Sequence, residues 1–153
     1  MRNWKINLAA AWIAQFLSIA GFSVAFPFLP FYIRELGVTE VHQVELWTGL
    51  LNSVAALSMA LISPFWGVLA DRYGRKLMVE RATFGGAIIL AAMAFAGNVQ
   101  QLFVLRIIQG MLTGTVPAFM TLTACMAPPT QAGFALGLMQ MAVFSGSFVG
   151  PML

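Results

Sequence analysis

The sequence predicts an all-α membrane protein with five membrane-spanning helices. Hydrophobic residues make up 60% of the 153 residues and charged residues only 8%, with a mean hydropathy of +0.87. A soluble domain usually has about a quarter of its residues charged. The charged residues stand in short clusters, and the uncharged runs between them exceed the roughly 20 residues that cross a hydrocarbon core of about 30 Å.

The uncharged runs locate the spans in order. Runs 6–33, 46–70 and 82–105 hold 28, 25 and 24 residues, and each can cross the membrane once. Run 107–153 holds 47 residues, which as one helix would be about 70 Å long, so it must turn back. Residues 127–133 contain two consecutive prolines, which cannot continue a helix. We therefore expect one membrane domain over residues 1–153, with spans at 7–33, 46–70, 82–105, 107–127 and 134–153.

Lysine and arginine predict the orientation, because positively charged loops stay in the cytoplasm. The amino terminus carries two of them, residues 34–45 one against three glutamates, residues 71–81 four, and residues 97–101 none. The amino terminus and residues 71–81 are therefore expected to be cytoplasmic, in a multi-pass protein of the cell membrane. The fifth span ends at Leu153 without a polar flank, so we expect a longer protein of which this is the amino-terminal part.

The stretch GVLADRYGRK carries the densest charge of the chain. Its pattern G-x-x-x-D-R-x-G-R-K consists of Gly67, Asp71, Arg72, Gly74, Arg75 and Lys76. A positive-inside loop explains the basic residues but not the spacing of the glycines and the aspartate. Gly67 lies one turn before Asp71 and permits close approach of a neighbouring helix, while Gly74 permits a tight reversal. A carboxylate at this boundary is stabilised by an arginine or a helix amino terminus, an arrangement that can act as a latch.

This stretch resembles the loop between the second and third helices of the major facilitator superfamily of secondary transporters. Three further groups of residues resemble elements of that family in order and location: Gly21, Pro27 and Pro30; Arg106, Gln109 and Gly110; and Gly146, Gly150 and Pro151. The resemblance extends over the whole chain and is closest to the twelve-helix branch of drug:proton antiporters. It implies that the five helices form an incomplete amino-terminal six-helix half of a major facilitator fold.

Arg106 has two possible interpretations. A charge in the membrane costs at least about 2.5 kcal/mol unless it is shielded, so its side chain either snorkels to the interface or faces the helix bundle. The resemblance implies the second, with a role in proton coupling beside Gln109 and Gly110. No Asp or Glu occurs within the five expected spans to pair with it.

The glycine and proline groups also have two interpretations. Gly146 and Gly150 share a helix face and are typical of close helix packing, whereas with Pro151 the resemblance implies bending and control of leakage. Pro27 and Pro30 fit a simple kink as well as the family's first-helix element with Gly21.

The resemblance implies a secondary active transporter that exports a lipophilic small molecule or drug by alternating access, coupled to protons. Its expected partners are the substrate, protons, the lipid bilayer and a carboxy-terminal half, which would hold the partner of the Asp71 latch. Polarity alone suggests which side chains line the substrate path: Gln15, Ser18, Ser23, Gln109, Thr113 and Thr115.

Other functions lack support in the sequence. The single histidine, His42, and the single cysteine, Cys125, form no catalytic or metal-binding cluster, so we expect neither an enzyme nor a cofactor. The basic residues form no continuous face for nucleic acid. The open alternatives are a metabolite transporter of the same fold, a membrane module that does not transport, and a half-size protein that pairs with itself.

Overall fold

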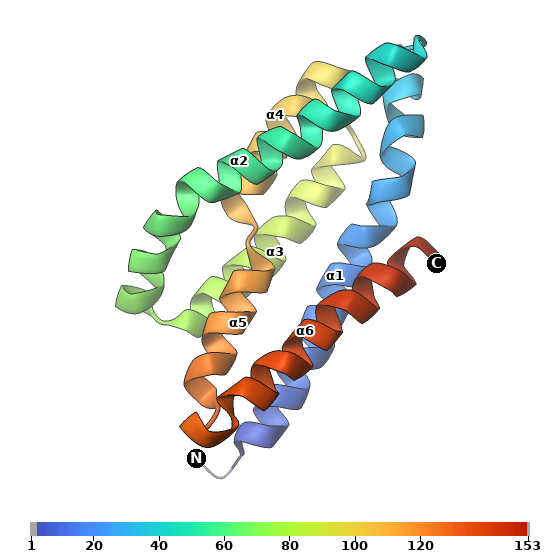
Figure 1. The fold of residues 1–153 in the computed structure, drawn as a ribbon. Helices are drawn as coiled ribbons and strands as arrows, with labels where there is room; N and C mark the ends of the chain where they lie inside the picture. Colours follow the sequence, from blue (N-terminus) through green and yellow to red (C-terminus); the bar gives the residue numbers. More distant parts are fainter. Residues whose placement is uncertain (1–2, 153) are drawn as a thin grey trace. The chain divides into compact units, whose positions relative to one another are not determined.

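The structure, a computed structural model, describes residues 3–152 and is helical over most of them (Figure 1). The elements are α1 (Trp4–Glu35), α2 (Val41–Tyr73), α3 (Arg75–Met93), α4 (Val99–Leu112), α5 (Thr115–Met126), η1 (Pro129–Gln131), α6 (Ala132–Val149) and η2 (Gly150–Met152). Residues 3–152 contain no β-strand. The predicted all-α fold class is confirmed.

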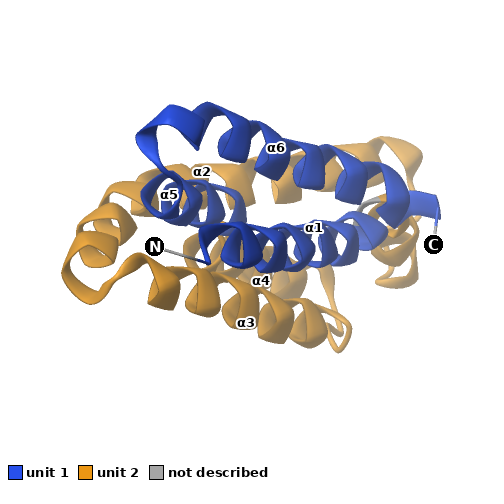
Figure 2. Cartoon of the chain, turned by 90° about the horizontal axis from the view of Figure 1, so that it is seen from below, with its two compact units in different colours: residues 1–26, 115–153 blue, residues 27–114 orange. Residues whose placement is uncertain are grey.

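The chain divides into two compact units, coloured separately in Figure 2. Unit 1 comprises residues 1–26 and 115–153, and unit 2 comprises residues 27–114. The chain passes from unit 1 to unit 2 at Pro27, inside α1, and returns to unit 1 after Gly114. Pro27 has no N–H to donate within α1, and Gly114 has a φ of 119°. Each unit is described by itself below, and the single membrane domain stays a prediction.

Within residues 3–152, four helical stretches are long and apolar enough to cross a membrane. They are Trp4–Ala25, Val41–Tyr73, Val99–Met126 and Pro129–Met152. Helix α3 has 19 residues, which gives it a length of about 28 Å. Its first two turns carry Arg75, Lys76, Glu80 and Arg81, so it is too charged to qualify by composition. A count of five spans therefore requires α3 to cross with these charged turns at one membrane boundary.

The expected span 82–105 does not correspond to one helix. Helix α3 ends at Met93, and α4 begins only at Val99. The side chain of Asn98 accepts a hydrogen bond from the backbone N–H of Gln101 at 2.7 Å and caps the amino terminus of α4. The intervening turn contains no charged residue, so the uncharged run joined the end of one helix to the first two turns of the next.

The expected span 107–127 also differs from the helices observed. The apolar stretch begins at Val99, and it is interrupted between Leu112 and Thr115, where α4 gives way to α5. The hydroxyl of Thr113 donates to the carbonyl of Gln109 at 2.6 Å at this interruption. Helix α5 ends at Met126, just before the two consecutive prolines, and α6 begins at Ala132.

The apolar core of unit 2 joins one end of each of its helices. Its buried members are Leu29, Ile33, Val44, Leu51, Ile89, Met93, Ala96, Val99 and Leu102. Tyr32 lies against this core, and its hydroxyl is within hydrogen-bonding distance of the carbonyl oxygens of Met93, at 3.0 Å, and Ala96, at 2.9 Å. Carbonyls at a helix end lack partners within the helix, so Tyr32 joins the end of α1 to the end of α3.

Replacing Tyr32 by Phe should lower the free energy of unfolding by about 0.5–1.5 kcal/mol, because the apolar ring is kept and the hydrogen bond is lost. Thermal unfolding of the full-length protein in detergent measures the change. Tyr73→Phe is the matched control, since Tyr73 is 59% exposed. Equal melting temperatures for the two variants would contradict the role of the Tyr32 hydroxyl.

Candidate functional site

The stretch 67–76, hereafter the 67–76 loop, contains the reversal between α2 and α3. Helix α2 ends at Tyr73 and α3 begins at Arg75, so Gly74 alone connects them. Gly74 has a φ of 94°, and its N–H donates to the carbonyl of Ala70 at 3.0 Å. Only glycine adopts such a φ without strain. The backbone therefore requires glycine at this position of the motif.

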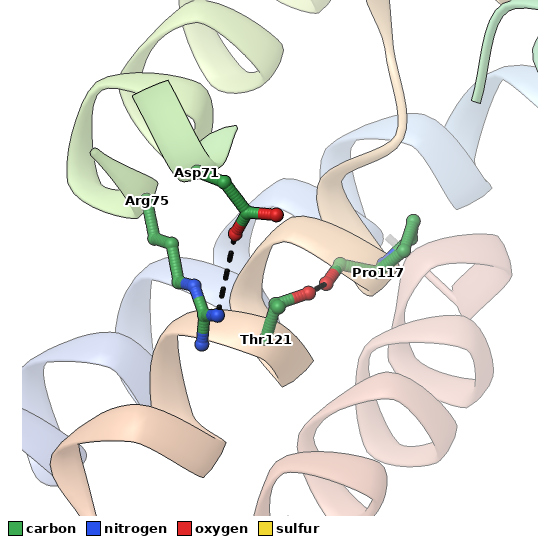
Figure 3. A network of polar contacts seen from close by, with 4 residues as sticks. All are labelled: Asp71, Arg75, Pro117 and Thr121. Atoms are coloured by element: carbon green, nitrogen blue, oxygen red, sulfur yellow. Dashed lines mark hydrogen bonds and ion pairs between the residues drawn. The ribbon is translucent and has the colours of Figure 1, made fainter. Parts of the chain in front are cut away.

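An ion pair connects the two sides of this reversal. Figure 3 shows the carboxylate of Asp71, near the end of α2, beside the guanidinium of Arg75, with Oδ1 and Nη2 3.5 Å apart. The side chains are 74% and 32% exposed, respectively. An exposed pair of this kind contributes about 0–1 kcal/mol to stability. Asp71 is therefore not needed to fold the loop, and its carboxylate is accessible to another group.

The other members of the motif, Gly67, Arg72 and Lys76, are exposed. Lys76 forms an exposed ion pair with Glu80 at 3.6 Å, and the guanidinium of Arg72 lies 5.6 Å from the ring centroid of Tyr73. A Cβ atom added to Gly67 would meet no atom within 4 Å. No helix among the described residues packs closely on Gly67, so the close approach expected there does not occur within residues 3–152.

Arg106 lies in the third turn of α4, about 10 Å from its first residue. Its side chain is only 7% exposed, and Nη1 donates to Oε1 of Gln109 at 3.1 Å. Gln109 is itself 7% exposed. A snorkelling arginine would expose its guanidinium, so this burial supports the interpretation that Arg106 faces the protein interior. Its expected link to protons stays a prediction.

Gly110 lies where α4 packs most closely on α2. A Cβ atom at this position would lie 2.3 Å from the carbonyl oxygen of Ala55 and 2.8 Å from Cβ of Ser58. Both distances are shorter than any non-bonded contact that a real side chain makes. Gly110 therefore determines how closely α4, which carries Arg106 and Gln109, approaches α2.

In unit 1, α6 packs on α1 through two glycines one turn apart. A Cβ atom at Gly146 would lie 2.9 Å from the carbonyl oxygen of Phe16, and one at Gly150 would lie 2.5 Å from Cβ of Ser23. The hydroxyl of Ser23 also donates to the carbonyl of Ser147 at 3.0 Å. This is the close packing expected of paired small residues.

The remaining glycine and prolines of the predicted bending and packing set differ in where they lie and in what they contact. Pro27 and Pro30 lie inside the continuous helix α1, and Pro151 lies in η2 just beyond α6. Gly21 was grouped with the packing and bending residues, but a Cβ atom there would meet nothing within 4 Å. Gly21 therefore makes no close helix contact among the described residues.

The expected path residues have different surroundings. Gln15 is completely buried, Thr115 is buried, and Ser18 is half-buried. Ser23 and Thr113 both donate to backbone carbonyls, so their hydroxyls are already used in helix packing and in the end of α4. Of the expected path residues, Gln15 offers the most unused hydrogen-bonding capacity, since neither end of its amide has a partner among residues 3–152.

The structure adds a cluster in unit 2 that was not predicted. The indole N–H of Trp66 donates to the carbonyl of Met111 at 2.7 Å, and the guanidinium of Arg81 lies 3.5 Å from the centroid of the Trp66 ring. The first contact connects α2 to the end of α4, and the second connects it to α3. In the sequence, the position of Trp66 near the charged residues 71–81 was the only signal for such a cation–π contact.

Two further polar groups in unit 1 were missed. The indole nitrogen of Trp12 and the hydroxyl of Thr123 are buried and have no hydrogen-bond partner among the described residues. Neither residue was expected from the sequence to belong to a site. By contrast, the hydroxyl of Thr121 donates to the carbonyl of Pro117, one turn earlier in α5 (Figure 3).

Residues 3–152 contain no cluster of three or more His, Cys, Asp or Glu side chains that could hold a metal ion. The side chains singled out above are instead charged groups at a helix reversal, a buried arginine with a glutamine, and glycines at helix crossings. These groups can form ion pairs and allow close helix packing, and they offer no nucleophile with an adjacent base.

The profile of the Major Facilitator Superfamily matches residues 11–153. Multidrug resistance protein MdtG of Proteus mirabilis (strain HI4320) is 43% identical over 151 residues, which are 99% of this chain and 38% of that protein. MdtG of Rahnella sp. (strain Y9602) is 44% identical over 151 residues, with 99% and 37% covered. MdtG of Escherichia coli (strain K12 / DH10B) is 44% identical over 150 residues, with 98% and 37% covered. The chain thus spans less than two fifths of the length of these relatives.

Proposed function

The chain belongs to the Major Facilitator Superfamily, and on that premise we propose that it is part of a secondary active transporter that exports lipophilic small molecules or drugs in exchange for protons. The names of the relatives, multidrug resistance proteins, support the substrate class. The chain is a multi-pass membrane protein, and we place it in the cell membrane with a cytoplasmic amino terminus.

The observation that carries this proposal is the burial of Arg106 within the apolar stretch Val99–Met126. A buried guanidinium in a membrane helix is costly, and such residues usually belong to an ion or substrate pathway. Its hydrogen bond to Gln109 is made to a neutral amide, which brings no charge of its own. A change of charge near Arg106, by protonation or by substrate binding, therefore alters its energy strongly.

The second half of the transporter is part of the proposal. The relatives are long enough for more than twice the helices found here, since this chain covers 37–38% of them. In secondary transporters two repeats enclose a site near the membrane midplane and rock about it. We assign to the carboxy-terminal half the group that meets Asp71 when the cytoplasmic side is closed.

The latch predicts that Asp71→Asn, introduced into the full-length protein, reduces export by about 5- to 150-fold, the usual range of coupling between two sites. The amide keeps the size of the side chain but removes its charge. Because the pair with Arg75 is exposed, stability should change by less than about 1 kcal/mol. Dye efflux from cells and the amount of protein in the membrane measure the two effects.

Glu80→Gln is the matched control, since Glu80 also pairs with a residue one turn away in the same charged stretch, Lys76. This variant should export at the rate of the unchanged protein. Undiminished export by Asp71→Asn would contradict the proposed role of Asp71 as a latch but not the proposed transport function. Loss of export by both variants would show that the loop responds to net charge and not to Asp71 itself.

The direct test of the function is transport by the full-length protein in proteoliposomes. An imposed pH gradient should drive accumulation of a lipophilic dye such as Hoechst 33342, and dissipating the gradient should stop it. Gradient-driven movement of polar metabolites without movement of dyes would favour a metabolite transporter of the same fold. No gradient-driven movement of either class would contradict the proposal.

A further inference from the structure

Trp12 and Gln15 place three unused hydrogen-bonding groups on one side of α1. They are three residues apart, so their side chains are neighbours on the helix surface. The Trp12 Nε1, the Gln15 Nε2 and the Gln15 Oε1 are all buried and have no partner among residues 3–152. Gln15 is 0% exposed. A glutamine amide can donate two hydrogen bonds and accept two, and here none of these is made.

These groups share their lack of a partner with the buried hydroxyl of Thr123 and contrast with three other hydroxyls of unit 1. The hydroxyls of Ser23, Thr121 and Ser145 each donate to a backbone carbonyl. Side chains in apolar surroundings normally find such partners, because a buried polar group without one is unfavourable. The unpaired groups of Trp12 and Gln15 are therefore suited to a ligand that binds reversibly.

The position of Gln15 matches the depth at which secondary transporters bind their substrates. Gln15 is eleven residues beyond Trp4, the first residue of α1, which places it about 16 Å along the helix. That distance is about half of a hydrocarbon core of about 30 Å. Substrate sites of these transporters lie near the midplane.

The surroundings favour an uncharged partner. Residues 6–25 and 115–152 contain no Asp, Glu, Lys, Arg or His, so this part of unit 1 offers no counter-charge. A charged group brought to Gln15 would lose its hydration without an opposite charge to compensate. A neutral amide would instead exchange two hydrogen bonds with the Gln15 amide, and its carbonyl would accept a third from the indole of Trp12.

An apolar surface for the rest of such a molecule adjoins these groups. The rings of Trp12 and Phe16 are stacked, with centroids 5.6 Å apart and planes 3° from parallel. We propose that Trp12 and Gln15 form a recognition site for an uncharged amide carried by a lipophilic molecule. This site rests on the proposed transport function and specifies the polar feature that it selects.

The test uses equilibrium binding to the purified full-length protein without any gradient. Two dansyl probes with the same hexyl chain are compared, one ending in a primary carboxamide and the other in a methyl ester, which accepts but cannot donate. The unchanged protein should bind the carboxamide at least about tenfold more tightly, because the ester leaves the Gln15 carbonyl unpaired. Equal affinities would overturn the proposal.

Two variants separate the roles of the two residues. Gln15→Leu should abolish the preference by weakening carboxamide binding about tenfold, with ester binding unchanged. Trp12→Phe keeps an aromatic ring but removes the N–H that donates to the carbonyl of both probes, so both should weaken by a similar factor. Gln140→Leu is the matched control, because Gln140 is exposed on α6, and it should change neither affinity.

Thermal unfolding distinguishes recognition from a structural role. Replacing an unpaired buried amide by an apolar side chain of similar size is neutral or stabilising, so Gln15→Leu should not lower the melting temperature. A lower melting temperature with an unchanged probe preference would mean that Gln15 binds structural water, which overturns the site. Amide preference in a protein that fails to export would preserve the site and contradict only the transport function.

Discussion

Arg106→Ala in the full-length protein is expected to reduce proton-driven export by about 5- to 150-fold, the range typical of coupling between two sites. Arg106 is 7% exposed in the apolar stretch Val99–Met126 and donates to Gln109. Alanine removes the buried charge, so a proton or substrate that arrives nearby no longer meets it. Binding of a lipophilic dye without a gradient should change less than gradient-driven export does.

The rate of proton-driven export by Arg106→Lys should lie between the rates of the unchanged protein and of Arg106→Ala. Lysine keeps the positive charge but replaces the planar guanidinium, which can hold two partners at once, by a single ammonium group. The bond to Gln109 then competes with any other partner of the side chain. An export rate for Arg106→Lys equal to that of Arg106→Ala would show that geometry matters as much as charge.

The measurement is dye export in proteoliposomes with an imposed pH gradient, at matched protein content. Arg34→Ala is the control, since Arg34 lies in the last turn of α1 and is exposed. It removes one positive charge from the chain without altering a buried site. Full gradient-driven export by Arg106→Ala would contradict a role in coupling.

Backbone requirements were the most predictable features of the candidate site. Gly74 was expected to permit a tight reversal, and its φ of 94° lies in a region open to glycine. Gly146 and Gly150 were expected to pack closely if they served packing, and Cβ atoms at both would overlap α1. These expectations depend only on the absence of a side chain at a given spacing, which the sequence states directly.

Features that depend on which helix faces which were not predictable. Gly21 and Gly67 look like packing glycines in the sequence, yet a Cβ atom at either would meet nothing within 4 Å. The interruption at residues 113–114 is invisible to hydropathy, because uncharged residues continue on both sides of it. The contacts of Trp66 with Arg81 and Met111 require three helices to be in place, so its position near one charged stretch did not predict them.

The scarcity of charged residues predicted a membrane protein, but the positions of the charged residues did not predict where the helices end. Arg106 was used to separate two expected spans, 82–105 and 107–127, although it lies inside α4. A charged residue usually marks a loop because burial of a charge is costly. Arg106 is an exception to this rule. Because keeping a charge inside the membrane is costly, a buried arginine there is expected to have a function.

Gly110→Ala should be the most destabilising single-methyl change in unit 2. The added Cβ would lie 2.3 Å from the carbonyl oxygen of Ala55, so α4 must move away from α2 or shift along it. Forcing an extra methyl into a packed interior typically costs about 1–3 kcal/mol, occasionally more. Thermal unfolding of the full-length protein in detergent measures the loss, and Gly49→Ala in α2 is the control, since a Cβ atom there would meet nothing within 4 Å.

A second substitution shows which group of α2, the Ala55 carbonyl or the Ser58 side chain, excludes a methyl group at position 110. Ser58→Gly removes the Cβ atom that would lie 2.8 Å from the new methyl, but it cannot remove the backbone carbonyl of Ala55. In the Ser58→Gly background, Gly110→Ala should therefore still lower the melting temperature by most of the original amount. Full recovery would mean that Ser58, and not the backbone of α2, sets the distance between the helices. Since Arg106 and Gln109 lie on α4, any displacement that persists should also weaken proton-driven export, whereas Gly49→Ala should leave both stability and export intact.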